Sequence, residues 1–380
     1  MRRESRDTNI KKVSDMPNKT AQDAADERFM RRCIQLAINS EGRTYPNPMV
    51  GAVVVRDGVI IGEGWHRKAG CPHAEVNAIA SVRDPEALRH STIYVSLEPC
   101  AHFGRTPPCA DLIIRSGIPR VVVGCRDSFA KVDGKGIMKL REAGLEVKVG
   151  VLEQECRWLN RRFFTIQEKG RPYVILKWAE TADSYMGGMR DGRPAPVAIS
   201  NAEALMAAHR QRTTEDAILV GIGTVVSDDP RLTPRLWRGP SPLRIVIDPR
   251  GEIPTGSRVL TDGGRTLVVG GKEGREVGAV KFVKADITPD NLALTAVMAA
   301  AAEGVSSMIV EGGAHTLAHF IESHMWDEAF VYQSDKMLGG GIEAPQLRLA
   351  ELMGVKHMGD CALRHFRNRD ASSCKYFKKI

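Results

Sequence analysis

The amino-acid sequence predicts an α/β protein with two domains, the first of which is a three-layer sandwich around a mixed sheet. Its 380 residues are long for one domain and sufficient for two. Apolar segments of strand length alternate with segments of helix length in both halves. The turn-forming string G-R-P at 170–172 separates the two patterns, so we expect the domain boundary there.

The N-terminal half begins with a polar leader and an amphipathic helix. Residues 1–25 contain no apolar segment, which predicts a disordered leader and excludes a secretory signal. Asp26 is expected to cap a helix that ends near Asn39, because apolar residues follow at helical spacing. We therefore expect the first domain to cover residues 26–150.

Strands and helices then alternate through this domain. A hairpin signal, Asp57-Gly58, joins the first two strands. One hairpin followed by alternating helices and strands predicts a mixed sheet with helices on both faces. The expected elements are strands at 50–56, 59–64, 92–97, 120–125 and 145–149, and helices at 73–81, 110–116 and 136–143.

A second α/β pattern follows a polar connection. Residues 151–171 are expected to form a linker helix, residues 172–366 the second domain, and residues 367–380 a basic, loosely ordered tail. The expected strands lie near 173–179, 216–221, 243–248, 265–270, 280–283, 306–310 and 327–333, and the helices near 201–212, 289–303 and 314–323.

Composition and charge limit the class of function. No apolar run approaches the ~20 residues that span a bilayer, and eight scattered cysteines without a small disulfide framework indicate a reducing, cytoplasmic setting. The net charge of +8 suits an anionic ligand, either a nucleic acid or a phosphorylated small molecule. Aromatic content is only 6% and no dense Lys/Arg stripe occurs, so the charge alone does not support polynucleotide binding.

Two strings carry the most specific chemistry: C-P-H-A-E at 71–75 and E-P-C-A-H-F-G-R-T-P-P-C at 98–109. His73, Cys100 and Cys109 would give a zinc ion three protein ligands and leave the fourth position for water. Zinc lowers the pKa of its bound water to about 7. Glu75 is not a ligand and is placed to transfer protons. An H-x-E string followed by P-C-x-x-C is typical of zinc nucleobase deaminases, although eight residues separate the cysteines here.

Alternatives to this zinc site remain at the level of sequence. Cysteines in a cytosolic chain are often buried apolar residues, and Cys71 is a rival ligand. We prefer His73 because it begins a helix and directly precedes Glu75. Residues two apart on a helix do not share a face, so this pair converges only over the first turn. Cys109 also starts a helix, where the dipole favours a thiolate.

The C-terminal half contains a glycine-rich turn, E-G-G at 311–313, between an apolar strand and a helix. Backbone N–H groups at such a turn bind anions, although an ordinary tight turn is the alternative. The string G-I-G-T at 221–224 lacks the third glycine of a dinucleotide fingerprint. Acids at 228–229 and Arg235 share one loop, which could hold hydroxyls and a phosphate or could simply be solvated.

Together these motifs resemble the bifunctional riboflavin-biosynthesis deaminase/reductase family over residues 26–366. In the first half the resemblance rests on N-P-M-V-G-A-V-V-V (47–55), H-A-E (73–75) and the long insertion between the cysteines (98–109). In the second half it rests on L-K-W-A (176–179), I-L-V-G-I-G-T (218–224), D-D-P-R-L-T-P-R (228–235), V-E-G-G (310–313) and K-M-L-G-G (336–340).

The resemblance implies a cytidine-deaminase-like fold for the first domain and a dihydrofolate-reductase-like fold for the second. It implies zinc-dependent hydrolytic deamination of a diaminohydroxyphosphoribosylaminopyrimidine, with Glu75 as the proton carrier. It also implies NADPH-dependent reduction of the ribosyl group to ribityl. We therefore expect a small phosphorylated pyrimidine as substrate, no nucleic-acid or membrane partner, and a homo-oligomer.

The resemblance also assigns binding residues. The first domain's substrate contacts match Asn47, His66, Ala74, His102, Arg105 and Thr106. The second domain's substrate contacts match Arg212, Leu232, Arg235 and Glu311. Cofactor contacts match Ala179, Thr224, Asp228, Gly312 and Gly313.

The chain departs from the family pattern mainly in its second half. The family's S-L-D-G-[KR] reads T-A-D-S-Y at 181–185, a common Trp is Ala198, and a substrate Ser is Pro196. In the first half, D-P-N-P reads D-S-F-A at 127–130. Two alternatives therefore stay open. The second half could be a non-catalytic binding module, or the chain could be a nucleic-acid deaminase, which predicts a short C-x-x-C and no second domain.

Overall fold

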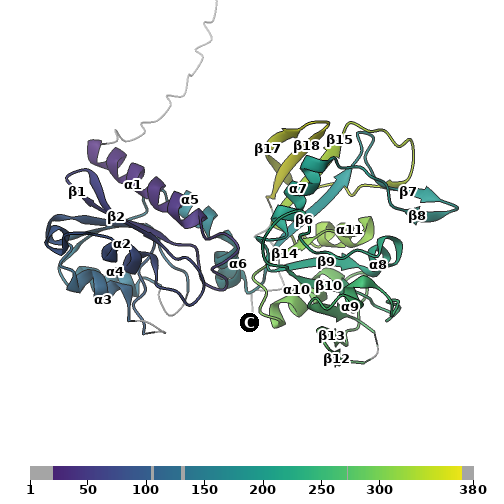
Figure 1. Cartoon of the computed structure of the whole chain (residues 1–380), viewed down its shortest axis with the longest axis horizontal. Coiled ribbons are helices and arrows are strands. Elements are labelled where there is room, and N and C mark those ends of the chain that lie inside the picture. The colour runs from purple at the N-terminus through teal and green to yellow at the C-terminus, as the bar shows by residue number, and fades with distance from the viewer. Residues whose placement is uncertain (1–19, 104–106, 130–132, 272, 370–380) are drawn as a thin grey trace, which may run out of the picture.

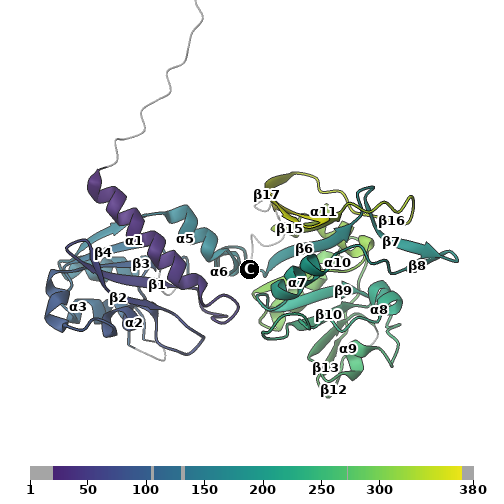
Figure 2. The same cartoon turned by 45° about the horizontal axis from the view of Figure 1, so that its top comes forward.

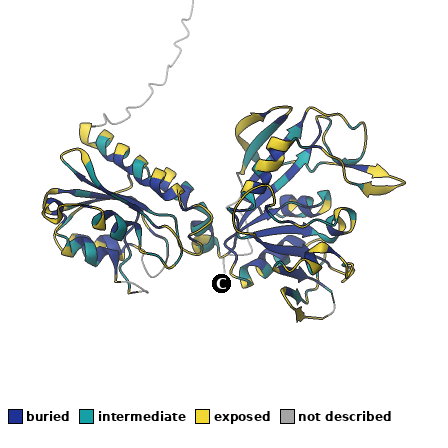
Figure 3. Ribbon diagram, in the orientation of Figure 1, coloured by how far each residue is buried: buried dark blue, intermediate teal, exposed yellow. Residues whose placement is uncertain are grey.

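The computed structural model describes residues 20–103, 107–129, 133–271 and 273–369. Two α/β domains lie side by side and are joined by short helices, with the N-terminal domain in purple to blue and the C-terminal domain in teal to yellow (Figure 1). Buried residues concentrate in the two central sheets and on the helix faces that cover them (Figure 3). Within the described ranges, no helix has the length and apolar character needed to cross a membrane.

The described part of the N-terminal domain contains a five-stranded mixed sheet in the order β2-β1-β3-β4-β5. Strand β1 is antiparallel to β2 and β3, whereas β3, β4 and β5 are parallel. This is the predicted mixed sheet. The strands are β1 (Gly51–Arg56), β2 (Val59–Trp65), β3 (Thr92–Leu97), β4 (Arg120–Cys125) and β5 (Glu146–Val149). The helices are α1 (Ala21–Ile38), α2 (Ala74–Ala80), a 3-10 helix η1 (Pro85–His90), α3 (Cys109–Arg115) and α4 (Lys135–Glu142).

Alternating strand residues build two cores, one on each face of this sheet. Val54 packs with α2, α3 and α4, whereas its neighbour Val53 packs with α1 and the linker. Helices therefore cover both faces, which is the predicted three-layer sandwich (Figure 2). Gly64 permits close packing of β2 on α2, because a Cβ there would lie 2.4 Å from the backbone nitrogen of Ala78. This contact fixes the helix that begins beside His73.

The first helix corrects two predictions. It begins at Ala21 rather than after residue 25, so the expected leader is too long by one helical turn. Thr20 is the cap, and its side chain and Asp23 form a capping box. Asp26, the expected cap, is instead buried inside the helix, where Arg120 and Lys148 donate hydrogen bonds to its carboxylate at 2.9 and 2.8 Å. Long-range partners therefore outweighed its local preference for a cap.

The linker consists of two helices, α5 (Glu153–Leu159) and α6 (Arg161–Lys169), and not the single helix predicted for 151–171. They meet at Asn160, whose backbone (φ −103°, ψ 24°) is not helical. The Asn160 side chain accepts from the backbone N–H of Met49 and donates to its carbonyl, at 2.8 and 2.9 Å. The break therefore ties the linker to the loop before β1.

The C-terminal domain contains a ten-stranded sheet in its described residues, in the order β12-β13-β11-β10-β9-β14-β6-β15-β18-β17. In that order, each strand from β13 to β15 is parallel to its neighbour within the run. At the two ends of the sheet, β12 is antiparallel to β13, β18 is antiparallel to β15, and β17 is antiparallel to β18. The parallel strands are β6 (Tyr173–Glu180), β9 (Ala217–Gly221), β10 (Leu243–Ile247), β11 (Thr266–Val269), β13 (Val280–Val283), β14 (Ser307–Val310) and β15 (Glu328–Ser334). All of these were predicted.

Helices cover both faces of this sheet as well. Helices α10 and α11 pack on one core, whereas α7, α8 and α9 pack on smaller clusters of the other face. The helices are α7 (Ala202–Gln211), α8 (Ile222–Asp228), α9 (Arg258–Thr261), α10 (Leu292–Ala302) and α11 (Ala314–Glu322). Of these, α8 and α9 were not predicted, because each is a single short segment within a loop-like composition.

The prediction was also wrong at the C-terminus. Strand β18 (Cys361–Asn368) continues beyond residue 366, so the second domain includes residues assigned to the tail. It forms a hairpin with β17 (Ala350–Met358), whose residues are mostly exposed and show no alternating apolar pattern. Four further short strands were missed: β7 (Tyr185–Arg190), β8 (Arg193–Ala195), β12 (Arg275–Val277) and β16 (Ile342–Glu343).

Candidate functional site

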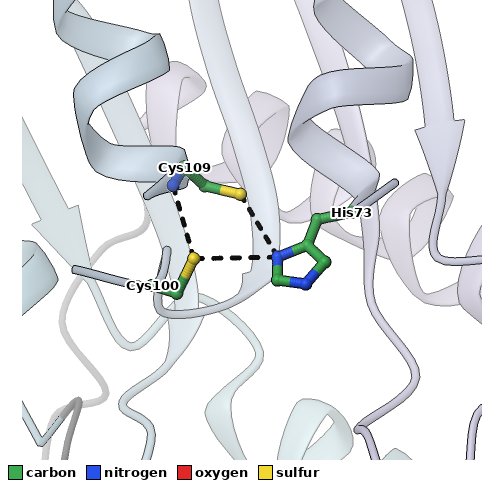
Figure 4. Close-up of side chains that lie close together, drawn as sticks. All are labelled: His73, Cys100 and Cys109. Carbon is green, nitrogen blue, oxygen red and sulfur yellow. Dashed lines mark hydrogen bonds between the residues drawn. The ribbon is translucent and has the colours of Figure 1, made fainter. Parts of the chain in front are cut away.

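Three side chains from distant parts of the N-terminal domain converge on one point (Figure 4). His73 directly precedes α2, Cys100 lies in the loop after β3, and Cys109 is the first residue of α3. The His73 Nδ1 lies 3.7 Å from the Cys100 Sγ and 3.3 Å from the Cys109 Sγ. The nitrogen and the two sulfur atoms all lie within 4.8 Å of one another. One nitrogen and two sulfurs at this spacing fit the donor set of an open zinc site.

The two cysteines of this cluster interact directly. Cys109 donates hydrogen bonds to the Cys100 sulfur, which lower the pKa of Cys100 below its usual range. The same hydrogen bond, together with burial, raises the pKa of Cys109 well above its usual range. Because a thiol binds a metal ion as the thiolate, metal binding at this pair would release a proton. Cys71, the rival ligand, is half-buried and lies outside this cluster.

Glu75 lies in the first turn of α2 and is only 3% exposed. Burial, together with the nearby Cys100 thiolate, raises the pKa of its carboxyl to about 7. His73 has an extended backbone (φ −71°, ψ 166°) as the cap of α2, so its side chain does not follow helical spacing. This explains how residues two apart can face the same point. The carboxyl group can hold or release a proton near neutral pH.

A cavity of about 630 Å³ opens beside this cluster. Asn47 and His66 form one part of its wall. His66 Nδ1 lies 3.2 Å from the carbonyl oxygen of Pro72, and its Nε2 lies 3.3 Å from the amide nitrogen of Asn47. Burial lowers the pKa of His66, so the ring is neutral and can donate to Pro72 while it accepts from Asn47. This leaves the amide oxygen of Asn47 as an acceptor at the cavity wall.

Of the other substrate residues predicted for this domain, one lines the cavity, one has its side chain in the core, and two lie outside the described residues. His102 lines the cavity, and its buried Nδ1 has no hydrogen-bond partner among the described residues. This nitrogen can therefore form a hydrogen bond with a ligand in the cavity. The side chain of Ala74 is buried in the core beneath α2. Arg105 and Thr106 lie outside the described residues.

Sequence reasoning missed several residues of this site. The Glu98 carboxylate accepts backbone N–H bonds from Asp127, Gly134, Gly136 and Ile137, at 3.2, 3.0, 2.9 and 3.2 Å. It thereby ties the strand that leads to Cys100 to the first turn of α4 and to the segment before that helix. Its place two residues before that cysteine was the only signal. Burial raises the pKa of Asp127, also at the cavity wall, to about 6. Phe163 and Gln167 reach the cavity from α6, and no local motif indicates this.

A second polar cluster lies in the C-terminal domain at the end of β14. Arg212 donates two hydrogen bonds to the Glu311 carboxylate, at 2.8 and 2.7 Å. The Nζ atom of Lys177 lies 3.7 Å from the same carboxylate. Against the effect of burial, these two cations lower the pKa of Glu311 to about 2. Arg212 and Glu311 were predicted, whereas Lys177 was missed although it stands in the L-K-W-A string.

The glycine turn lies next to this cluster. A Cβ on Gly312 would lie 2.7 Å from the Val220 Cβ and 3.0 Å from the Thr224 Oγ1, so only glycine fits there. Gly313 has φ +64° and precedes α11. The structure thus brings Thr224 together with both glycines. The backbone at the start of α11 is suited to an anion such as a cofactor phosphate.

The remaining predicted residues of this domain do not form one cluster. Leu232 is buried with φ +56°, Arg235 and Asp228 are exposed, and Ala179 is half-buried on β6. Asp228 accepts a hydrogen bond from Ser227 at 2.6 Å. Burial, followed by Coulombic interaction with Arg212 and Arg235, lowers the pKa of His209 to about 4.

The departure at 181–185 keeps an ordered turn. Ser184, which replaces the family glycine, has φ +63°, a conformation that glycine adopts without strain. The Asp183 carboxylate accepts N–H bonds from Leu338 and Gly339 at 3.0 and 2.7 Å. Lys336 donates to the carbonyl oxygen of Ala198 at 2.6 Å. Asp183, which the family pattern shares, and the backbone carbonyl of Ala198 therefore still hold the K-M-L-G-G segment in place.

Comparison with known proteins gives matches to both halves. Residues 23–125 match the family model of the cytidine and deoxycytidylate deaminase zinc-binding region, and residues 172–368 match that of the RibD C-terminal domain. Riboflavin biosynthesis protein RibD of Aquifex aeolicus is 40% identical over 331 residues, which cover 86% of this chain and 92% of the relative. The RibD protein of Bacillus amyloliquefaciens is 38% identical over 343 residues, which cover 88% and 90%.

Solved structures show the same arrangement of domains. A diaminohydroxyphosphoribosylaminopyrimidine deaminase/5-amino-6-(5-phosphoribosylamino)uracil reductase from Thermotoga maritima aligns with a TM-score of 0.83 and 35% identity, covering 91% of this chain and 99% of that one. Acinetobacter baumannii RibD aligns with a TM-score of 0.80 and 31% identity, with coverage of 91% and 99%. These matches confirm the predicted fold classes and the family resemblance.

Proposed function

We propose a division of chemical roles within this chain, which belongs to the RibD family of bifunctional riboflavin-biosynthesis enzymes. Its N-terminal domain is a zinc deaminase and its C-terminal domain is an NADPH-dependent reductase. The substrates are those named for the Thermotoga maritima relative: diaminohydroxyphosphoribosylaminopyrimidine for the first step and its deaminated product for the second. The observation that carries the proposal is a buried Glu75 beside the convergent His73, Cys100 and Cys109 at a cavity wall.

In the deaminase, His73, Cys100 and Cys109 would hold the zinc ion. When bound, zinc supplies an activated water at neutral pH. Glu75 accepts a proton from the attacking water and returns it to the departing amino group, a role that suits a carboxyl with a pKa near 7. The neutral His66 fixes the amide of Asn47, whose oxygen accepts a hydrogen bond from the pyrimidine.

Binding of the ribose phosphate is assigned to the loop between the two cysteines. His102 offers its unpartnered Nδ1 at the cavity wall, and Arg105 and Thr106 are assigned to the same phosphate from the family resemblance. The backbone of Ala74, at the start of α2, is assigned to the base. A cationic side chain beside the cavity is the group that a phosphorylated substrate requires.

In the reductase, the turn formed by Gly312 and Gly313 holds the cofactor together with Thr224. Ala179 and Asp228 are assigned to the cofactor from the family resemblance. NADPH, when bound, supplies the hydride. Arg212, Leu232, Arg235 and Glu311 are assigned to the substrate. To this set we add Lys177, because it contacts the Glu311 carboxylate from the neighbouring strand β6.

Two alternatives are weaker than this proposal. A non-catalytic C-terminal module would not need the preserved contacts of Asp183 with Leu338 and Gly339. A nucleic-acid deaminase would not need a second domain, and the cysteines here are separated by a long insertion. We therefore propose a small phosphorylated substrate and no nucleic-acid partner, with the cytoplasm as the place of action.

The exposed edge of the large sheet supports a homo-oligomer. Strand β17 is an outer strand of the sheet, and Leu352, Met353 and Val355 on it are 46–49% exposed. Exposed apolar side chains on an unpaired edge strand favour pairing with another chain. We propose a second copy of this chain as that partner, which sedimentation of the wild type against a Val355→Lys variant would test.

The proposed limits of the parts are 20–150 for the deaminase, 151–171 for the linker helices and 172–368 for the reductase. The full-length chain tests the function. Metal analysis, ammonia release from the aminopyrimidine and NADPH consumption with the deaminated product should all be positive. Ammonia release without NADPH binding would favour the binding module, and absence of stoichiometric zinc would overturn the deaminase mechanism.

A further inference from the structure

Helix α11 carries two histidines that face each other outside both assigned sites. His315 and His319 are four residues apart, so they lie on the same side of the helix. Their rings are edge-on, with centroids 4.4 Å apart and an interplanar angle of 84°. The two Nε2 atoms lie 3.3 Å apart. His315 is exposed and His319 half-buried, so solvent ions reach the pair.

We propose that this pair is a second divalent transition-metal site, separate from the cysteine-containing one. Zinc–nitrogen bonds of about 2.0–2.1 Å at a tetrahedral angle place two nitrogens about 3.3 Å apart. The distance of 3.3 Å between the Nε2 atoms of His315 and His319 therefore matches the nitrogen–nitrogen distance in a tetrahedral zinc site. Imidazole suits zinc, copper and nickel, which defines the ligand as a borderline divalent metal. Without metal, one protonated nitrogen donates a hydrogen bond to the other ring.

Nearby groups favour a cation at this position. Glu322 lies a further turn along the same face of α11, and both it and Asp290, which precedes α10, act electrostatically on His319. Burial and the neighbouring His315 lower the pKa of His319, so its ring is neutral and offers a lone pair at pH 7. The pair begins two residues after Gly313. An ion here would thus add positive charge beside the turn assigned to the cofactor.

Metal stoichiometry of the full-length protein tests this site. Zinc titration with a competing chromophoric chelator should give two equivalents for the wild type and one for the His315→Ala/His319→Ala variant. His357→Ala, which removes an exposed histidine from β17, should keep two and serves as the matched control. A single equivalent for the wild type, or two for the double variant, overturns the proposal.

Cobalt substitution separates the two sites by their ligands. The first equivalent should bring the thiolate-to-metal absorption expected for Cys100 and Cys109, and the second should add none. A second equivalent that increases this absorption would show binding to cysteine and would overturn the histidine site. Failure of the deaminase mechanism would instead appear as loss of the first equivalent, so the two outcomes are distinguishable.

A different observation carries a second inference, because helix α6 contacts both domains. Toward the N-terminal domain, Phe163 and Gln167 of α6 line the deaminase cavity, and Phe164 is buried in the deaminase core. The preceding Asn160 holds both backbone groups of Met49, two residues after Asn47. One wall of the cavity is therefore built on the linker.

Two arginines of the same helix reach into the reductase domain. Arg161 donates a hydrogen bond to the Glu328 carboxylate at 2.5 Å, and Arg162 forms a bidentate ion pair with the Glu215 carboxylate. Both glutamates are almost completely buried, with side chains 0% and 1% exposed. Paired charges at this depth fix the helix firmly against the reductase, since an unpaired partner would be strongly destabilising.

We infer that Arg162 is a positioning residue for the deaminase, acting through the linker on the cavity wall. This inference rests on the proposed deaminase function. Glu215 contacts Arg162 from the reductase side and lies outside the cavity. A change at Glu215 should therefore alter deamination although no atom of that residue reaches the pyrimidine.

The Glu215→Gln variant of the full-length chain tests this positioning role. Deaminase KM should rise between about threefold and a hundredfold, with zinc content and the wild-type pH profile retained. Glu168→Gln, a change on the same helix as Arg162 that removes an exposed partner of Arg157 in α5, should leave KM unchanged. Should Glu215→Gln fail to fold, Arg162→Lys, which keeps the charge, supplies the same readout.

Unchanged deaminase KM in a folded, zinc-loaded Glu215→Gln or Arg162→Lys protein overturns the positioning role. A wild-type protein that releases no ammonia would instead overturn the deaminase mechanism, so the two failures differ.

Discussion

Replacing Glu98 by glutamine should loosen the zinc loop more than any single surface change in that domain. Each oxygen of the Glu98 carboxylate accepts two backbone N–H bonds: Oε1 from Gly136 and Ile137, and Oε2 from Asp127 and Gly134. A glutamine keeps one oxygen and turns an NH₂ group toward the other two donors. Two buried donors lose their acceptor, at roughly 1–3 kcal/mol each, so the free energy of unfolding should fall by about 2–6 kcal/mol.

Urea unfolding of the full-length protein measures this loss, and zinc competition measures its effect on Cys100, two residues away. We expect a lower unfolding midpoint and weaker zinc binding, since the loop that carries the cysteine loses its anchor. Glu86→Gln is the matched control, because Glu86 is exposed and pairs only with Arg89 in the described contacts. If Glu98→Gln and Glu86→Gln unfold at the same urea concentration, the anchoring role is refuted.

Three further predictions concern the active sites. Glu75→Gln should keep zinc but lower the ammonia-release rate about 10²–10⁴-fold with NADPH oxidation spared, and equal loss of both activities would contradict it. Glu311 has its pKa lowered from 4.5 to about 2, so its contribution of roughly 3 kcal/mol should be complete above pH 4.5 and disappear as the pH falls toward 2. Acid unfolding of Glu311→Gln against wild type measures this, and an identical pH dependence of the two would refute it. Gly312→Ala should raise the KM for NADPH because its Cβ meets Val220, with deamination as the internal control; an unchanged KM would remove the turn from the cofactor site.

The sequence alone predicted the convergence of His73, Cys100 and Cys109 because their motif is dense and local. His73 and Glu75 are two residues apart, and the cysteines occur within one loop. The choice between His73 and Cys71 followed from the start of the helix, and the structure brings His73 to the cysteines. The parallel strands of both sheets were also predictable, since buried parallel strands are continuous apolar runs.

What the sequence could not predict depends on contacts between distant residues. Asp26 looked like a helix cap, but its partner Arg120 is ninety-four positions away and draws it into the interior. Strand β17 was missed because its exposed residues lack the alternation that marks a half-buried strand. Phe163 and Gln167 reach the cavity from the linker, and no spacing in the chain indicates that.

The two-helix linker has a practical consequence for anyone who wishes to express the halves separately. A cut after Arg171 would leave the carboxylates of Glu215 and Glu328 in the reductase fragment without the arginines of α6. A cut before Glu153 would instead take Asn160 from Met49 and Phe164 from the deaminase core. Each fragment would thus expose residues that are buried against the other fragment in the full-length chain. Co-expression of the deaminase and reductase fragments should therefore give more folded protein than expression of either fragment alone.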